Sequence, residues 1–463
     1  MDRTMMPPGY AGESGLAPAM TRVAAFVLGD GPVSAPAAAR ARAAQLLLDT
    51  LGICVAAAPM EAGTIARDTA ALLYGGDSPR HSARMLFDGR RVSLAGAAYA
   101  AATQIDNLDG HDGYNPTKGH IGVAVVPALA ALADAGAEMS GPEALATLIV
   151  GYEVAGRAGI SLHASVSDYH TSGAWNALGV AAMAARARRH SPEVLRESLG
   201  IAEYHGPRSQ MMREISNPTM LHDGSGWGTL AGLSAAVLAE RGFTGAPAVT
   251  IESPEAAPHW QDLGSFWQVE RQYVKPYPTC RWGHAAIDAV RELQLAHGFS
   301  HEQVAEVRVK SFTYAVELFR GMPDSTSKAQ YSLAFAVGVM LVHGRLGLEH
   351  ISGSGLRDAA VADIVDRTVL IEEPRHQARY PEGRWSDVDI ILTDGRMLSS
   401  GDVHARGGPE RPFTQGDIVA KFMEFTPPVI GRSRADEIRD AALGLTGAGS
   451  RFSDLAALLY GTP

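Results

Sequence analysis

The sequence predicts a mainly α protein with a smaller α+β domain, in which an all-helical core domain is joined to an α+β lid. The chain has 463 residues, which is too long for a single hydrophobic core. Alanine-rich apolar segments of helical length follow one another up to about Thr244, whereas strand-like alternation and a hairpin signal come after it. Helical patterns return at the C-terminus, so we expect the α+β region to be an insertion.

These changes divide the chain into three expected regions. Residues 1–269 form the helical domain, and within it residues 1–20 are a flexible tail without the basic start and apolar core of a signal peptide. Residues 270–405 form the lid domain. Residues 406–463 form helices that pack back on the helical domain.

The helices of the first region carry recognisable start signals. Ser93 is placed to cap a helix that begins at Leu94, and Ser140 with Glu143 has the S-x-x-E pattern of a capping box. Small residues dominate these segments, which allows the helices to pack closely. The expected helices span residues 37–58, 61–74, 94–105, 121–135, 144–159, 175–189 and 227–241.

The lid is predicted from strand signals. Residues 304–314 alternate between apolar and polar, as a half-buried strand does. Residues 386–392 and 397–400 flank Thr393-Asp394-Gly395-Arg396, and an Asp-Gly pair in that place favours a hairpin. The expected helices of the lid and the C-terminal region span residues 329–343, 356–365, 418–424, 434–445 and 453–459.

Composition excludes several classes of protein. Lys and Arg total 40 against 50 Asp and Glu, a formal charge of −10 without a dense basic run, which argues against nucleic-acid binding. Cys54 and Cys280 are the only cysteines, as expected in a reducing compartment and not in a disulfide scaffold or zinc ribbon. No uninterrupted apolar run reaches the roughly 18 residues of a membrane span. We therefore expect a cytoplasmic protein.

The polar stretch from Asp106 to His120 lies between two apolar helical segments. It holds Asp109, His111 and Lys118 between those ends, together with several glycines. Such a loop can place acids, bases and a cation at the mouth of a helical core, because histidine takes up and returns protons near neutral pH. The alternative is a solvated surface loop with an acidic helix cap.

Two further stretches carry histidines beside cations. His170 precedes a helix, where it is either functional or a hydrogen-bonded cap residue. Lys275, Arg281 and His284 belong to a proline-stiffened segment before another helix, which is either a binding segment or a domain hinge. Lysine and arginine bind carboxylates, and arginine can do so with two parallel hydrogen bonds.

Known cofactor and nucleophile motifs do not occur. The sequence contains no G-x-G-x-x-G after a strand, no G-x-x-x-x-G-K-[ST], no H-E-x-x-H and no G-x-S-x-G. His111, Asp112 and His120 could in principle join a metal site, but short polar loops often match such loose patterns. We expect no metal and no cofactor.

Taken together, these segments resemble the MmgE/PrpD family over residues 35–445. The similarity rests on order and spacing more than on any single motif. It is carried by Asp106–His120 with Val125-Val126-Pro127-Ala128, Gly151-Tyr152-Glu153-Val154 with Arg157, Tyr169-His170-Thr171, Gly232–Ala239 with Gly242-Phe243-Thr244-Gly245, Lys275-Pro276-Tyr277-Pro278-Thr279-Cys280 with His284, and Ala329-Gln330-Tyr331-Ser332-Leu333. The resemblance implies a helical domain with a smaller α+β lid, a homodimer, and no metal or organic cofactor.

The resemblance also implies site residues. Asp106 and Asp109 match the acidic pair of the family, His120 its loop histidine, His170 its second histidine and Lys275 its lid lysine. These five are the expected catalytic residues.

Four positions depart from the family pattern. Gly110 replaces a threonine, Ile121 replaces the proline of a His-Pro-Gly motif, and Met220 or Leu221 stands where the family has a lysine. The loop adds Lys118, which would supply a cation in place of the missing lysine. These changes suggest a different carboxylate substrate from those of the dehydratases and decarboxylases of the family.

The expected function is that of a cofactor-independent lyase acting on a small di- or tricarboxylate. Proton transfer next to a carboxylate would use His120 and His170, and cations would stabilise the developing charge. An epimerase of a dicarboxylate such as iminodisuccinate needs nearly the same residues, and a non-catalytic carboxylate-binding protein is a third alternative. The expected substrate-binding residues are Lys118, His111, Arg281 and His284.

Overall fold

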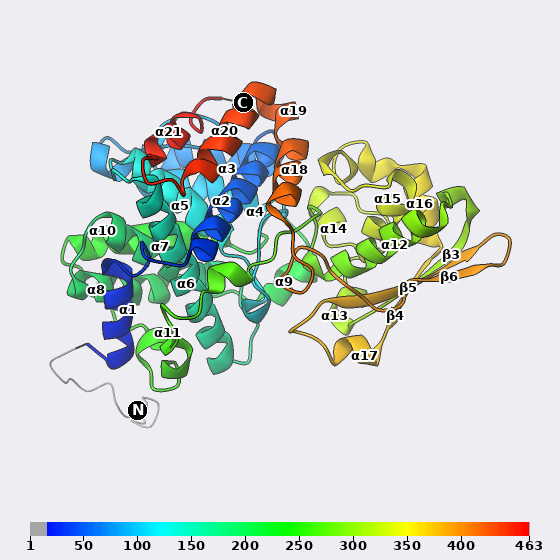
Figure 1. Ribbon diagram of the computed structural model, residues 1–463, viewed down its shortest axis with the longest axis horizontal. Coiled ribbons are helices and arrows are strands. Elements are labelled where there is room, and N and C mark those ends of the chain that lie inside the picture. The colour runs from blue at the N-terminus through cyan, green and yellow to red at the C-terminus, as the bar shows by residue number, and fades with distance from the viewer. Residues whose placement is uncertain (1–15, 463) are drawn as a thin grey trace.

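The computed structural model describes residues 16–462, which form a large helical body and a smaller lid (Figure 1). The body lies on the left of the figure, and the lid extends to the right with a small mixed sheet. The prediction of a mainly α protein with a smaller α+β domain is confirmed.

The N-terminal part of the body differs from the prediction. Residues 1–15 of the expected flexible tail lie outside the described residues, but residues 18–20 belong to helix α1 (Pro18–Leu28) and not to a tail. Pro18 stands in the first turn, where proline is well tolerated. Met20, Val23 and Val27 repeat at helical spacing and are fully buried, which anchors the helix to the body.

The other body helices surround a core rich in alanine. Two of them, α6 and α7, approach closely, because a Cβ atom added at Gly179 would lie 2.7 Å from the carbonyl oxygen of Gly151. Ser93 and Ser140 cap their helices as predicted, but Glu143 binds Arg186 and does not complete a capping box. The bounds of the main body helices are α2 (Ala37–Ala57), α3 (Glu61–Leu73), α4 (Leu94–Asp106), α5 (Gly122–Asp134), α6 (Gly141–Ser165), α7 (Gly173–Ala187), α8 (Pro192–His205), α9 (Met211–Ile215) and α10 (Ser225–Glu240).

The sheet of the lid has the strand order β4-β3-β5-β6, and β7 also pairs with β5. Its strands are β3 (Val304–Ser311), β4 (Thr368–Glu372), β5 (Trp385–Leu392), β6 (Met397–Ser399) and β7 (Val403–His404). Strand β3 pairs in parallel with β4 and antiparallel with β5, and β5 and β6 form the predicted hairpin. Helices α12 (His284–His297), α15 (Leu333–His343) and α16 (Ala359–Asp366) lie together on the sheet (Figure 1).

One predicted helix of the lid is two helices in the structure. The segment 329–343 contains the end of α14 (Thr326–Gln330) and the whole of α15. Tyr331 and Ser332 separate them, and the Ser332 side chain accepts a hydrogen bond from the Phe335 N–H, which caps α15.

The C-terminal helices lie against the body (Figure 1). Helix α18 (Gln415–Phe425) packs on α2, and a Cβ atom at Gly52 would lie 2.8 Å from the Phe422 ring. The ammonium of Lys421 binds the Asp49 carboxylate of α2 at 2.6 Å. Helices α20 (Arg432–Gly444) and α21 (Phe452–Ala457) follow and contact α2 and α5, so the chain returns to the body after the lid.

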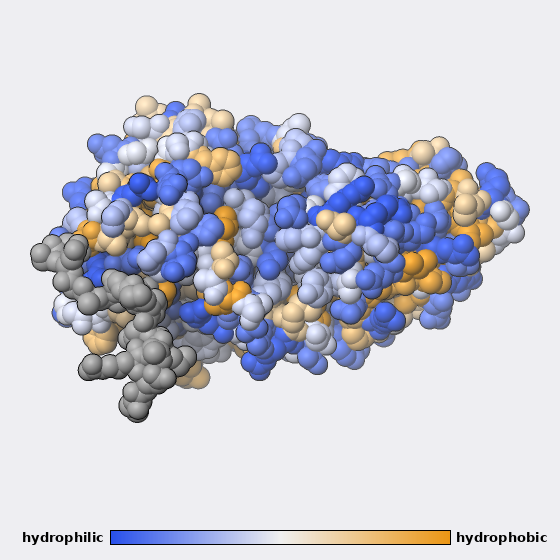
Figure 2. Space-filling view, turned by 90° about the horizontal axis from the view of Figure 1, so that it is seen from below, coloured by the Kyte–Doolittle hydropathy of each residue, from blue (hydrophilic) through white to orange (hydrophobic). Residues whose placement is uncertain are grey.

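Helix α6 is long and apolar enough to cross a membrane, but 94% of its most apolar window is buried inside the protein. Helices α2 and α3 pass the same test only as a pair bent by 91°. Burial of this extent is that of a core helix. Figure 2 shows hydrophobic residues in small separate groups on one face of the molecule, among hydrophilic ones.

Candidate active site

A small cavity lies where the loop between α4 and α5 meets the lid. Both parts of the molecule contribute side chains to it. The lining residues are Asp109, Lys118, His120, Tyr169, Met211, Ile215, Asp223, Tyr273, Lys275, Cys280, Arg281, Trp282, Tyr331 and Arg384. The structure therefore brings together five of the nine residues that the sequence predicted for the site.

The predicted loop is folded inward and is not a solvated surface loop. Asp109, His111 and Asp112 are buried, and Asp109 and Lys118 both have a φ of 54°, a left-handed conformation uncommon for residues other than glycine. The N–H groups of Gly113 and Tyr273 each donate to the other residue's carbonyl, at 3.0 and 2.8 Å. This pair joins the loop to the segment that leads into the lid.

His120 is held in one tautomer. Its Nδ1 lies 2.7 Å from the carbonyl oxygen of Asp112, which can only accept, so Nδ1 carries the proton and Nε2 is free to act as a base. Burial, with the nearby Lys275 ammonium, holds the pKa of His120 well below its usual range. The imidazole is therefore neutral at pH 7.

Asp223 faces this base. Its Oδ2 lies 3.6 Å from Nε2 of His120. The carboxylate accepts hydrogen bonds from the N–H and the hydroxyl of Ser172, at 3.1 and 2.8 Å, and burial raises the pKa of Asp223 to about 6. The Ser172 hydroxyl also accepts a hydrogen bond from the backbone N–H of His120 at 3.0 Å, so this serine contacts both Asp223 and His120. His120 and Asp223 can hold one proton between them near neutral pH.

Asp223 and Ser172 were not among the residues predicted from the sequence. Each of them stands just before a predicted helix, but each is a single polar residue without a motif of its own. The nearest signal was the His-Asp pair formed by His222 and Asp223 ahead of α10.

Lys275 and Asp109 form a buried ion pair that connects the lid segment to the loop. The ammonium binds the Asp109 carboxylate and donates to the Asp109 carbonyl oxygen at 3.0 Å. Burial raises the pKa of Asp109, and the positive charge of Lys275 opposes that rise. The lysine is thus placed on the cavity wall with its charge partly neutralised.

Asp106 lies outside this cavity. Its Oδ2 accepts from the N–H of Ser225 at 3.1 Å, at the start of α10. Burial, with Asp223 nearby, holds the pKa of Asp106 well above its usual range. Asp106 and Met220 instead line a neighbouring depression, so the side chain at the family's lysine position is not on the cavity wall.

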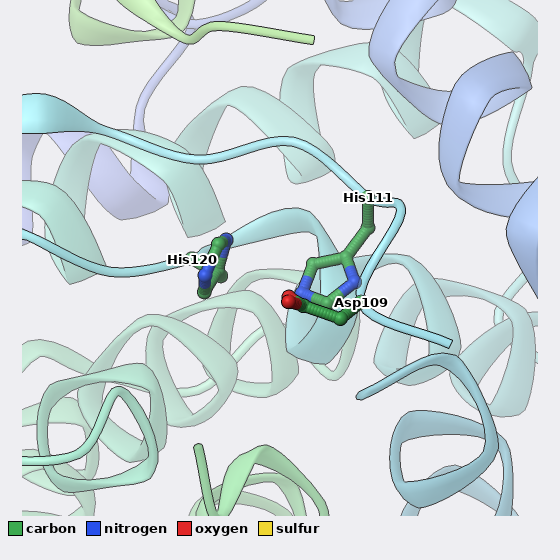
Figure 3. Close-up of side chains that lie close together, drawn as sticks. All are labelled: Asp109, His111 and His120. Atoms are coloured by element: carbon green, nitrogen blue, oxygen red, sulfur yellow. The ribbon is translucent and has the colours of Figure 1, made fainter. Parts of the chain in front are cut away.

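His111 and His284 are buried behind the cavity. The ring of His111 lies 4.6 Å from that of His120, centroid to centroid (Figure 3). Neither nitrogen of His111 has a hydrogen-bond partner among residues 16–462. His284 Nε2 lies 2.9 Å from the Thr279 carbonyl oxygen, and its Nδ1 lies 3.5 Å from Nη1 of Arg281. Burial is the largest cause that holds the pKa of each histidine well below its usual range. Their predicted contact with substrate stays a prediction.

His170 lies apart from the cavity wall. Its ring stacks on that of His163 with centroids 6.4 Å apart, and the backbone N–H of His170 donates to Nε2 of His163 at 3.2 Å. Burial, followed by the charge of Arg208, lowers the pKa of His170. Its catalytic role stays a prediction, and it would require a path through neighbouring groups such as Tyr169.

Besides Lys275, three cations line the cavity, and none of these three forms an ion pair with a carboxylate within residues 16–462. Lys118 lies over the Tyr169 ring at 4.8 Å, Arg281 over Tyr273 at 4.5 Å, and Arg384 over Tyr380 at 4.7 Å. Burial lowers the pKa of Arg281 to about 10. Cations kept on a cavity wall without counter-charges suit an anionic ligand.

Arg384 had no signal in the sequence. It stands in an ordinary lid segment between Gly383 and Trp385, and only the fold brings it to the loop that holds Lys118.

Asp109, His111 and His120 could offer three ligand atoms that lie within 4.8 Å of one another (Figure 3). The Asp109 carboxylate is already engaged by Lys275, and the charges of Lys275 and Lys421 contribute to the low pKa of His111. These residues fit a metal poorly, because a cation would have to compete with the ammonium groups. The expectation that no metal binds stays a prediction.

Nearly the whole chain is similar to known protein families and to curated relatives. Residues 21–297 match the MmgE/PrpD N-terminal domain, and residues 277–446 match the MmgE/PrpD C-terminal domain. A cis-aconitate decarboxylase of Aspergillus terreus is 23% identical over 418 residues, which cover 82% of this chain and 84% of the relative. A cis-aconitate decarboxylase of A. terreus strain NIH 2624 / FGSC A1156 is 23% identical over 425 residues, with the same coverage.

Proposed function

Because the chain belongs to the MmgE/PrpD family, we propose that it is a cofactor-independent lyase, of the dehydratase or decarboxylase type, acting on a small di- or tricarboxylate. The relatives named cis-aconitate decarboxylase support this class of reaction, since they span most of the chain. At 23% identity they do not specify the acid.

The observation that carries the proposal is the pairing of a neutral base with unpaired cations in one cavity. His120 presents an unprotonated Nε2, because its Nδ1 proton is committed to the Asp112 carbonyl. Lys118, Arg281 and Arg384 line the same cavity without carboxylate partners in the described part of the chain. A base beside carboxylate-binding cations is the arrangement required for proton transfer at a carbon next to a carboxylate.

The residues suggest how the steps would be divided. In a dehydration, Nε2 of His120 would take the proton from carbon, the electron pair would form the double bond, and the hydroxyl would leave with a proton from a neighbouring acid. In a decarboxylation, the C–C electron pair would remain on the carbon that loses CO₂, and that carbon would take the proton that is held between Asp223 and His120. In both reactions Lys275 would stabilise the negative charge that develops on the carboxylate next to the reacting carbon.

Asp223 is the carboxyl group best placed to exchange a proton with His120. Its Oδ2 lies 3.6 Å from Nε2, and burial raises its pKa to about 6. Burial raises the pKa of this acid and lowers the pKa of this base, which brings the two values closer together, so one proton can pass between the two groups. We infer that Asp223 supports the acid–base role, alongside or in place of the predicted His170.

The test is an NMR screen of the full-length protein in deuterated water against a panel of small di- and tricarboxylates. We expect loss of water or CO₂ from one acid, with deuterium incorporated at the reacting carbon. Deuterium exchange with inversion but no elimination would replace the lyase by the epimerase. Binding of an acid without any chemical change would favour a carboxylate-binding protein. The His120→Asn protein is the matched control for contaminating activities.

A further inference from the structure

Arg384 is a buried guanidinium without a counter-charge. The residue is 2% exposed and forms no ion pair with the described residues. Its Nη1 donates to the carbonyl oxygens of Pro381 and Gly383, and its Nε is buried without a hydrogen-bond partner in the described part of the chain. A buried charge is expensive unless it is paired, so a fold that keeps one at a cavity wall leaves a place for an anion.

Lys118 faces the same place from the helical body. It stands in a left-handed turn, with φ of 54°, and its carbonyl oxygen accepts a hydrogen bond from the Tyr169 hydroxyl. This turn directs the ammonium over the Tyr169 ring and into the cavity that Arg384 also lines. Burial, and then the charge of Arg384, lowers the pKa of Lys118. The two cations are therefore close enough to repel each other when no anion lies between them.

The two side chains come from opposite sides of the boundary between body and lid. Lys118 belongs to the loop between α4 and α5, whereas Arg384 immediately precedes β5 of the lid sheet. The side chain of Asn115 in that loop donates to the Glu382 carbonyl oxygen at 3.2 Å, two residues before Arg384. An anion that bound Lys118 and Arg384 together would add a charged bridge at this junction.

We propose that Lys118 and Arg384 form a second anion subsite, which binds a substrate carboxylate other than the one beside the reacting carbon. This inference rests on the proposed function and makes it narrower, because the substrate must carry at least two carboxylates that reach both subsites. Arg384 then determines specificity, and the substrate holds the lid against the body while the reaction takes place. A monocarboxylate would leave the buried guanidinium unpaired.

The subsite is tested by binding, independently of turnover. Calorimetric titration of the full-length protein would use tricarballylate, succinate and propionate as probes. We expect tricarballylate to bind the wild type, and Arg384→Gln to weaken that binding by about 10- to 100-fold, the range for a lost charge-assisted hydrogen bond. Lys118→Met should weaken it to a similar degree. The double variant should lose less than the product of the two single effects, because both residues hold one anion.

Two further variants separate ligand binding from a structural role. Arg384→Lys keeps the charge and should retain part of the affinity. Arg379→Gln removes another lid arginine, which is ion-paired with Asp402 and does not line the cavity, and should leave tricarballylate affinity unchanged. If Arg384 only supported the lid, Arg384→Gln would lower the melting temperature without ligand and leave the dissociation constant of the folded protein unchanged. If Arg384→Gln failed to fold, Lys118→Met and Arg384→Lys would decide the question.

The outcomes distinguish this subsite from the proposed function. Equal tricarballylate affinity in the wild type, Arg384→Gln and Lys118→Met proteins would overturn the subsite while leaving the lyase intact. Propionate binding as tightly as tricarballylate would also overturn it. A wild type that bound none of the probes and turned over no acid in the NMR screen would remove both proposals together.

Discussion

The two walls of the cavity differ in how their polar groups are satisfied. On the body side, His120 is bonded to the Asp112 carbonyl and Asp223 to Ser172, so the groups that would move protons are held by their neighbours. On the lid side, Arg281 reaches two backbone carbonyl oxygens and Nδ1 of His284, whereas Arg384 reaches backbone carbonyl oxygens alone. The charges of these two arginines are not neutralised by any described carboxylate. Under the two proposals, the body wall would hold the groups that transfer protons, and the lid arginines, with Lys118 of the body, would bind the anion.

The largest expected effect is on the body wall, at His120. In His120→Asn the introduced amide can still donate to the Asp112 carbonyl, as Nδ1 does now, but it has no lone pair at the position of Nε2. We expect kcat to fall by about 10²–10⁴, the usual range for removing a general acid or base, with little change in melting temperature. Steady-state kinetics on the acid found in the screen measures this.

His170→Asn is the matched comparison, because this ring stacks on His163 and does not line the cavity. We expect it to lower kcat less than His120→Asn does. Full activity in the His120→Asn protein would remove the loop from the mechanism and return attention to His170 and Lys275.

The next effect concerns the ion pair that joins the two walls. Lys275→Met would leave the buried Asp109 carboxylate unpaired, and breaking a buried pair in this way costs about 3–5 kcal/mol of unfolding free energy. Burial already raises the pKa of Asp109, and loss of the lysine would raise it further, so stability would be lost as pH rises through that pKa. Urea denaturation should therefore show a larger deficit at pH 8 than at pH 5.

The double variant Lys275→Met/Asp109→Leu is the control, since it removes both charges. It should recover most of the lost stability but none of the activity. A Lys275→Met protein as stable as the wild type at both pH values would show that the pair is not buried in solution.

The same comparison explains what could be predicted from the sequence. The body wall was largely foreseeable, because Asp109, Lys118 and His120 lie in one polar loop between two apolar helices. The helix caps and the β5–β6 hairpin were also local signals. Arg384 is 266 residues from Lys118, and nothing in its neighbours indicates that the lid turns it toward the body.

Pairing across elements was the information that local patterns lacked. Sequence spacing places His170 in a polar stretch like that of His120, yet the turn before α7 directs Ser172 toward Asp223 and leaves His170 against His163. The first helix was missed for a different reason, because the polar and proline-rich residues before Pro18 resemble a tail that continues.

A smaller effect is expected from Asp223, on the pH dependence and not on binding. The pKa of Asp223 is raised to about 6, so its carboxyl group is protonated below that pH. That proton can pass to Nε2 of His120, 3.6 Å away, and Nε2 is then no longer free to act as a base. We expect kcat/KM of the wild type to rise as pH increases through about 6. In Asp223→Asn the rise should move down by about one pH unit or more, because the remaining group is His120, whose pKa is lower still. An unchanged profile would separate Asp223 from the proton transfer.

The smallest expected effect is that of chelation, which tests whether activity requires a metal ion bound to the body wall. Asp109, His111 and His120 offer ligand atoms within 4.8 Å of one another, but Lys275 already binds Asp109 and the Asp112 carbonyl holds Nδ1 of His120. A divalent ion would have to displace an ammonium from its carboxylate and settle beside Lys421, which Coulomb repulsion disfavours. We therefore expect full activity after dialysis against EDTA, with metal analysis showing far less than one ion per chain. The opposite result would be a loss of activity on chelation that one divalent ion restores in the wild type but not in His111→Asn. That result would mean that a metal ion, and not the Lys275 ammonium, stabilises the developing negative charge.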